Sequence, residues 1–319
     1  MNKTNKVILF IALISILLGG IIFVISIASL NFDFTKLNNK KLIENTIQIN
    51  EEFNNISIDV DTSDINFILS SEENKVVVKE TDKEKHEVKV IDNTLKITSI
   101  NNKEFIDYIG IHIYELKVDI YLSNSSYNNL LINNSTGDIY IPGSFTFNKI
   151  DIDGSTGDVE LSSNVNDELN INLSTGYIEI NNISANKLDI ETSTGDIEVN
   201  NVTINEDINI KVSTGYVSLD NINCNNLTSN GTTGDLEMSD VVVTNKMNLK
   251  RNTGDIEFFR CDAKEIIINT TTGDVKGTLL TDKIFDIDTN TGDKHVPSSK
   301  GEDSCKITTD TGDIYINIV

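Results

Sequence analysis

Acidic side chains recur at fixed places along the sequence. Asp directly follows a Thr-Gly pair in eight of ten copies, and Tyr177 and Tyr216 take its place in the other two. Two residues further on, five copies carry a glutamate: Glu160, Glu179, Glu198, Glu237 and Glu257. Carboxylates ligate hard cations such as Ca²⁺ and serve as the acid–base groups of glycoside hydrolases. These two acidic columns are therefore the strongest chemical feature of the sequence.

Two neighbouring copies carry both acids. Asp235, Glu237, Asp255 and Glu257 are expected to form a square of carboxylates on one outward face, with edges of about 5–7 Å. A flat face offers four ligands at most where calcium takes six to eight. We therefore expect at most a weak divalent cation site for Ca²⁺ and no other cofactor. The alternative is a solvated acidic face, in which each pair of neighbouring charges costs only about 1 kcal/mol.

The remaining reactive residue types do not form a catalytic pattern. His86, His112 and His295 stand in unrelated contexts without metal-ligand spacing, and no phosphate-binding loop, nucleophile elbow or Cys-x-x-Cys motif occurs. Parallel β-helices do include polysaccharide-cleaving enzymes, so such an enzyme is the alternative. Arg251 and Arg260 fall in different columns, however, and the outward columns contain few aromatic residues. We therefore predict a non-catalytic protein.

Three cysteines are an odd number for a disulfide framework. Cys224, Cys261 and Cys305 fall in three different columns of the repeat. Cys305 occupies an apolar column, and Cys261 shares a weaker one with Ile183, Val202, Ile222, Val241 and Leu280. We expect three free thiols that pack as small hydrophobic side chains.

The element that positions these residues is a repeat of 19 or 20 residues. Its ten glycines lie at 137, 157, 176, 195, 215, 234, 254, 273, 292 and 312. Apolar residues occupy positions seven and, in nine copies, five before each glycine, and positions two and four after it in nine of ten copies. This two-residue alternation predicts a half-buried strand on each side of a corner. Glycine at the corner indicates a backbone with positive φ.

Stacked copies of such a unit predict a β-solenoid. One coil cannot bury its apolar side alone, whereas parallel stacking buries a continuous column. We therefore predict an all-β, single-stranded parallel β-solenoid of about ten coils, a rod on the order of 50 Å long. Alternation gives the corner threonine inward parity, where its hydroxyl would bond within the scaffold.

The N-terminal segment is strongly apolar. Residues 7–30 carry no charge and are long enough to cross a bilayer. We predict a cytoplasmic N-terminus (1–6), a transmembrane anchor (7–30) and a polar tether (31–47). The alternative is a cleaved signal peptide, although the apolar run exceeds the usual signal core. The repeat domain is expected outside the cytoplasm, at the cell membrane.

The two ends of the solenoid need separate treatment. Residues 48–130 are predicted to form an N-terminal cap of antiparallel hairpins with one or two degenerate coils, because an open first coil would expose strand edges. The segment "NISIDVDTSDINF" (55–67) resembles a worn repeat with Ser63-Asp64 at the corner. Residues 131–319 are predicted to form the regular solenoid. Its last coil, "TGDIYINIV", has no evident cap and is expected to allow end-to-end self-association.

Net charge excludes one class of partner. The formal net charge is −23, with 26 basic against 49 acidic residues, so nucleic-acid binding is not expected.

The layout of membrane span, degenerate first coil, hairpin insert and "STGDI" coils resembles a bacterial putative-adhesin domain family of unknown function. The resemblance covers residues 48–319. It implies a binding or scaffold surface that contacts a protein or polysaccharide at the cell surface, and it brings no catalytic or binding residues with it. Some relatives are encoded beside envelope-stress systems, so a stress-response accessory protein is the alternative function.

Overall fold

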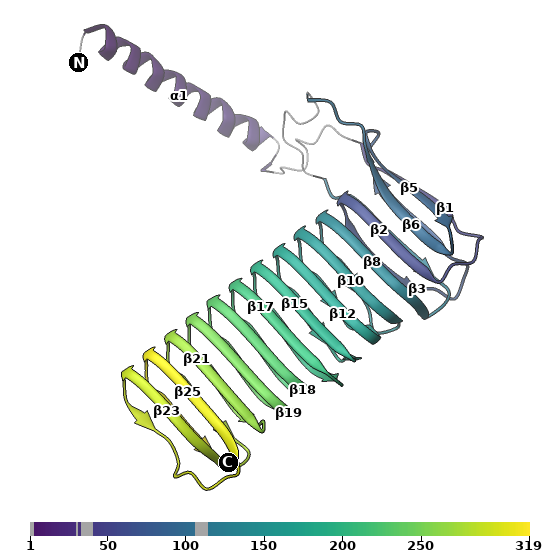
Figure 1. The fold of residues 1–319 in the computed structure, drawn as a ribbon. Coiled ribbons are helices and arrows are strands. Elements are labelled where there is room, and N and C mark those ends of the chain that lie inside the picture. Colours follow the sequence, from purple (N-terminus) through teal and green to yellow (C-terminus); the bar gives the residue numbers. More distant parts are fainter. Residues whose placement is uncertain (1–2, 30, 33–40, 106–113) are drawn as a thin grey trace.

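The structure, a computed structural model, describes residues 3–29, 31–32, 41–105 and 114–319. One helix, α1 (Lys3–Ser29), precedes a rod of stacked coils (Figure 1). The N-terminal part of the rod contains β1 (Ile43–Gln48), β2 (Asn55–Thr62), β3 (Asp64–Leu69), β4 (Lys75–Glu80), β5 (Glu84–Ile91), β6 (Thr94–Asn101) and β7 (Lys117–Leu122). The predicted parallel β-solenoid is confirmed.

Each regular coil has one strand before the Thr-Gly corner and one after it. The coils contain β8 (Ser126–Thr136), β9 (Ile139–Ile141), β10 (Thr146–Thr156), β11 (Val159–Leu161), β12 (Asn164–Thr175), β13 (Ile178–Asn181), β14 (Ser184–Ala185), β15 (Lys187–Thr194), β16 (Ile197–Ile204), β17 (Asp207–Thr214), β18 (Val217–Thr233), β19 (Leu236–Thr253), β20 (Ile256–Cys261), β21 (Glu265–Thr272) and β22 (Val275–Leu279). The last two coils of the sequence contain β23 (Lys283–Thr291), β24 (Lys294–His295), β25 (Asp303–Thr311) and β26 (Ile314–Ile318). Strands at the same position of neighbouring coils pair in parallel, as β15 does with β12 and β17.

The corner glycines have the conformation that the sequence predicts. All ten have positive φ, from 121° to 157°. The N–H of Gly195 donates to the carbonyl of Thr214 in the next coil at 3.0 Å. The corner threonines differ from the expectation, because all ten are exposed. Thr192, two residues before Thr194, is buried instead. The two-residue alternation ends at the corner, where the chain turns and places two successive side chains outside.

Asparagines hold the other two bends of the coil. Asn182, Asn201 and Asn221 have positive φ, between 51° and 58°. Their side chains bond along the rod, since the amide of Asn221 donates to Asn201 at 2.8 Å and that of Asn201 to Asn182 at 3.2 Å. A second ladder includes Asn205, whose amide donates to Asn186 at 2.9 Å. Asparagine tolerates this backbone region and bonds locally, which explains the Asn-rich return.

The first coil is the degenerate one. Ser63 takes the place of a corner glycine, and its N–H donates to Thr136 at 2.9 Å. Strand β6 pairs in parallel with β2, and β5 forms an antiparallel hairpin with β6. Strand β4 lies antiparallel between β7 and β1. Because β1 begins at Ile43, this part of the rod begins inside the segment expected to be a tether, of which residues 33–40 lie outside the described residues.

The C-terminal coil does not end the rod. Strand β25 pairs with β21 on one side and with β23 on the other, so the last coil of the sequence lies between the two that precede it (Figure 1). The end coil is formed by β23 and β24, and residues 296–302 connect it back to β25. The expectation that "TGDIYINIV" forms the open end is therefore wrong. Each coil carries the same columns, so their pattern allows either order.

Helix α1 is long and apolar enough to cross a membrane. Within its candidate span, Ile8–Ser29, an 18-residue window has a mean hydropathy of 3.1 and contains no buried side chain. A signal sequence near the N-terminus has the same properties, so the helix fits either a retained anchor or a cleaved signal.

Candidate functional site

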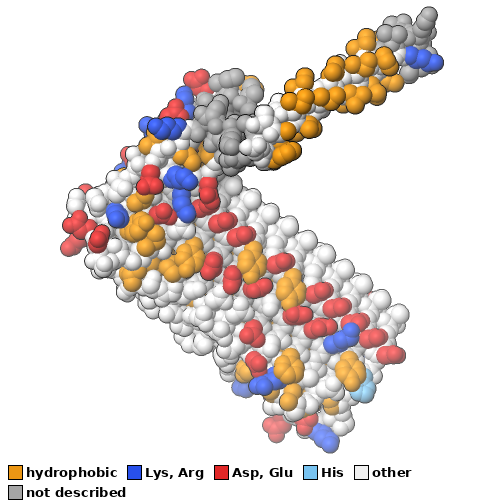
Figure 2. Space-filling view, turned by 180° about the vertical axis from the view of Figure 1, so that it is seen from behind, with side chains coloured by type: hydrophobic (Ala, Val, Ile, Leu, Met, Phe, Trp, Pro, Cys, Tyr) orange, Lys and Arg blue, Asp and Glu red, His pale blue; other side chains and the backbone are white. Residues whose placement is uncertain are grey.

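Acidic side chains form rows along one long face of the rod (Figure 2). Along this face the aspartates that follow the corner glycine form a ladder. The carboxylate of Asp235 accepts the backbone N–H of Asp255 at 2.8 Å, and Asp255 in turn accepts that of Asp274 at 2.8 Å. Seven such bonds, and an eighth to Asp64 after Ser63 in the first coil, join neighbouring coils at 2.8 to 3.0 Å. The Asp of the Thr-Gly-Asp phrase is therefore part of the scaffold.

Two tyrosines stand in this ladder. The N–H of Tyr177 and of Tyr216 donates to an aspartate as its neighbours do. The hydroxyl of Tyr216 donates to Glu237 in the next coil. Burial among these side chains and the nearby Glu237 carboxylate raise the pKa of Tyr216 to about 12. Burial and Glu198 likewise raise the pKa of Tyr177. Both phenols therefore stay neutral and serve as hydrogen-bond donors to the glutamate column.

The structure brings the four residues of the acid square onto adjacent coils. Glu237 and Glu257 are register partners, and Asp235 and Asp255 precede them at neighbouring corners. Both aspartates have one carboxylate oxygen committed to a backbone N–H, and Glu237 accepts the Tyr216 hydroxyl. Within the described residues, no group of three or more His, Cys, Asp or Glu side chains could hold a metal ion. Calcium binding at the square stays a prediction.

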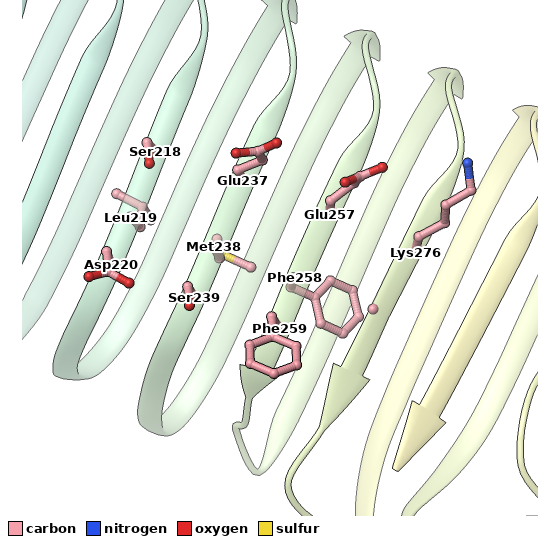
Figure 3. Close-up of a pocket in the computed structure, with 11 residues that line it drawn as sticks. Ser218, Leu219, Asp220, Glu237, Met238, Ser239, Glu257, Phe258, Phe259 and Lys276 are labelled. Atoms are coloured by element: carbon pink, nitrogen blue, oxygen red, sulfur yellow. The ribbon is translucent and has the colours of Figure 1, made fainter. Parts of the chain in front are cut away.

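The glutamates of the square line a groove of about 510 Å³ (Figure 3). Four neighbouring coils form it. One wall consists of Ser218, Glu237, Glu257 and Lys276, the opposite wall of Asp220, Ser239 and Phe259, and the floor of Leu219, Met238, Phe258 and Gly277. The walls are two outward columns of the same sheet, and the floor is the inward column between them.

The groove combines an exposed aromatic ring with negative charge. Phe259 is 54% exposed, whereas its neighbour Phe258 is buried. A Cβ at position 277 would overlap the ring of Phe258, so Gly277 leaves the space that this ring fills. Lys276 donates to Asp274 at 2.8 Å, and this contact raises the pKa of the lysine. The charge of Lys276 is therefore matched outside the groove, whose walls carry three further carboxylates.

A second polar cluster lies between the first coil and β5. The Ser63 hydroxyl lies 2.9 Å from Nε2 of His86, and Nδ1 of His86 lies 3.2 Å from the Glu80 carboxylate. Burial lowers the pKa of His86. The order of side chains resembles a catalytic triad, but Ser63 is only 2% exposed. The N–H groups of Ser63 and Asp64 both donate to carbonyls, which leaves neither for an oxyanion. The cluster therefore joins β4 and β5 to the first coil.

Comparison with known proteins agrees with this architecture. The family model described as Toastrack DUF4097 matches residues 53–206 and 205–319. The chain belongs to the Toastrack family. Among the curated proteins, none matches it.

Solved structures of Parabacteroides distasonis proteins resemble this Toastrack chain. A putative lipid binding protein shares 20% identity and a TM-score of 0.51, and the match covers 75% of this chain and 98% of that one. A putative adhesin shares 16% identity with a TM-score of 0.46, covering 88% and 98%. The first likeness supports the fold alone.

Sequence reasoning missed two features of this Toastrack rod. The pair "FF" at 258–259 places one ring inside and one outside, which two-residue alternation could have shown. His86 belongs to a buried network that no spacing in the sequence indicates. His295 stacks on Tyr315 with ring centroids 4.6 Å apart, and His112 lies outside the described residues.

Replacing Asp255 by alanine should lower the free energy of unfolding by about 1 kcal/mol, because the N–H of Asp274 loses a charged acceptor. Asparagine at the same position keeps an acceptor oxygen and is the matched variant, with an expected loss below about 0.5 kcal/mol. Denaturant titration of both variants measures the difference. Equal losses of unfolding free energy for the alanine and asparagine variants would show that the charge of Asp255, and not its hydrogen bond, stabilises the fold.

The three cysteines are buried free thiols, as the sequence predicts. Cys261 pairs with Leu279, not with the Leu280 expected in its column, because the register shifts after Phe258. Burial raises the pKa of each thiol to about 12.

Native protein should therefore resist alkylation at pH 8, since thiolate is the reactive form, and denatured protein should take three labels without reductant. Mass spectrometry counts the labels. A raised thiol pKa also means that the stability these groups contribute is complete below about pH 8.5 and falls as pH rises toward 12. Rapid labelling of the native protein would contradict the burial.

Proposed function

We propose that this chain is a membrane-anchored, extracytoplasmic binding rod of the adhesin type that does not catalyse a reaction. The groove between the glutamate column and Phe259 carries the proposal. It offers a flat aromatic face beside carboxylates on a sheet that the coil stack holds rigid. Helix α1 supports the anchor, and the Toastrack family match and the adhesin and lipid-binding descriptions of similar structures support a binding role.

The ligand that fits the groove best is a polysaccharide. A sugar ring can lay its C–H face on Phe259 while its hydroxyl groups donate to Glu237, Glu257 or Asp220. Its repeating units can continue along the rod, whose aspartate ladder extends on both sides of the groove. The three carboxylates favour neutral or amine-bearing sugars over acidic ones.

Replacing Phe259 by alanine should reduce binding to such a polymer at least about tenfold, the effect of losing about 1.4 kcal/mol of ring contact. The measurement is retention of full-length protein in detergent micelles on immobilised neutral, amine-bearing and acidic polysaccharides. Ile284→Ala, at an exposed residue of β23 far from the groove, is the control. Equal retention of both variants on every polymer would remove the groove from the proposal.

The alternatives give different outcomes. A polysaccharide-active enzyme would release shorter products, and Glu257→Gln would stop the release. A protein of the envelope-stress response would leave attachment unchanged when its gene is deleted but would lower survival of wall-active antibiotics. Measuring attachment, antibiotic survival and product release together therefore separates the three functions.

Weak calcium binding at Asp235, Glu237, Asp255 and Glu257 is a further part of this proposal. Millimolar calcium should then raise the melting temperature, and the double change Asp235→Asn and Asp255→Asn should abolish the rise while keeping amide acceptors for the ladder. Equal melting curves with calcium and with chelator would leave the acidic face a solvated surface.

A further inference from the structure

The order of coils at the C-terminal end differs from their order in the sequence. Strand β25 has seven register partners in β21 and eight in β23, and β26 pairs with both β22 and β24. Coils adjacent in sequence are usually adjacent in space. Here residues 303–319 occupy a slot, one coil wide, between two coils that the chain forms before them.

The slot recognises features that every coil of this chain shares. The inserted Gly312 lies against the carbonyl of Gly273, and its own carbonyl faces Gly292. The aspartate ladder passes through the insert, since Asp313 donates its N–H to Asp274 at 2.8 Å and accepts that of Asp293 at 2.8 Å. An occupant must therefore present a strand, a Thr-Gly-Asp corner and a second strand in this register. The C-terminal coil of a second copy has all three.

The strands of the end coil pair only with the insert among the described residues, and one buried side chain also joins this coil to the coil beyond the insert. Lys283 of β23 is fully buried, and its Nζ donates to the carbonyl of Ala263 at 2.7 Å and forms an ion pair with Asp262 at 2.5 Å. Both partners precede β21, on the far side of the slot. Only a weaker contact, 3.4 Å to Asp303, goes to the insert. The contact of Lys283 with Asp262 and Ala263 can therefore remain across the slot when the insert leaves.

The connection to the insert allows it to leave. Residues 296–302 contain no strand, and Ser298, Ser299 and Lys300 are exposed. Seven residues span up to about 24 Å when extended. Ser299 accepts the N–H of Phe285 at 3.0 Å, which places the connection across the outer edge of β23.

We propose that residues 303–319 are an exchangeable coil, which a second copy of the chain accepts in the same slot. Two copies that exchange this coil form a two-fold symmetric dimer. Every contact of the insert in the closed chain recurs in the dimer, so the two forms differ mainly in the connection and in the entropy of association. Dimer formation therefore depends on concentration and on the length of residues 296–302.

Cysteine cross-links test the exchange in the full-length chain. Cys224, Cys261 and Cys305 are first replaced by alanine. Asn269 and Thr308 are register partners, at a spacing that a disulfide can bridge. Asn269→Cys with one affinity tag and Thr308→Cys with another are co-expressed, oxidised and captured through the first tag. We expect a disulfide-linked pair carrying both tags, with a yield that rises at least twofold when Ser298 and Ser299 are deleted.

Three controls decide the result. The double variant Asn269→Cys, Thr308→Cys should close within one chain. The double variant Asn269→Cys, Asp288→Cys should not form a disulfide, because β25 separates the two residues. A disulfide in that variant would show that the coils stack in chain order and would overturn the insertion. Thr308→Cys with Glu160→Cys reports random collision. Absence of mixed pairs above that background, while the first double variant closes fully, would overturn the exchange.

Discussion

Replacing Gly195 by valine lowers the free energy of unfolding by about 3 kcal/mol or more, the largest expected effect of a single corner change. Two causes add. The φ of this residue is 145°, a region that a β-branched side chain resists. In addition, a Cβ would overlap the carbonyl oxygen of Gly176 in the preceding coil. Backbone cannot move away from this overlap without breaking the hydrogen bonds between coils.

The effect should also change how the rod unfolds. The stability of a solenoid is a sum over coils and over contacts between neighbouring coils. A weak contact between the coils of Gly176 and Gly195 should therefore separate the rod into two parts that melt in sequence. Circular dichroism and denaturant titration measure both effects. Thr194→Val at the same corner is the control, and because Thr194 is exposed we expect a change within about 0.5 kcal/mol. Unchanged melting of the Gly195 variant would contradict the assigned backbone.

Replacing Phe147 by alanine should cost about 3–5 kcal/mol. Phe147 is fully buried and lies in an aromatic cluster that connects the first coil to the regular ones. Its ring centroid lies 6.2 Å from that of Phe67, edge to face, and 6.1 Å from that of Tyr127. Truncation leaves a cavity between coils whose backbones are fixed by parallel pairing, so little collapse can fill it.

Phe259→Ala is the matched variant for this change. It removes the same side chain from an exposed site and should change stability by no more than about 0.5 kcal/mol. Thermal melts of the two variants compare their losses of stability. The polysaccharide assay should rank them in the opposite order: the Phe259→Ala variant loses binding, and the Phe147→Ala variant keeps it where it is folded. A large stability loss at Phe259 would show that its ring is a structural contact, and the groove proposal would then lose its aromatic face.

The sequence by itself determined the coil. Only glycine adopts the φ of the corner without strain, and the two-residue alternation on either side of it allows only one buried face. The positions of the ten corners and of their flanking strands could therefore be predicted from the sequence. The worn coil at 55–67 followed from the same columns, with Ser63 at its corner. Free cysteines followed from their separate columns.

The tertiary structure determined three features that the repeat pattern does not specify: the Asp ladder, the exposure of the corner threonines and the groove. The Asp ladder appears only when corners stack, because each carboxylate accepts an N–H some 20 residues away. The exposure of Thr194 depends on how the chain turns at the corner, which alternation along a straight strand does not describe. The groove needs Glu237 beside Glu257 and Phe259, and Glu237 comes from the neighbouring coil.

The order of the last coils is the clearest case. Phe285 and Cys305 satisfy the same inward column, and Gly292 and Gly312 the same corner, so the residues of either coil fit either place. The choice depends on Lys283, which is buried against Asp262 and Ala263 across the inserted coil, and on residues 296–302, which cross the outer edge of β23. Those contacts join segments that no repeat pattern relates, so only the folded chain could reveal them.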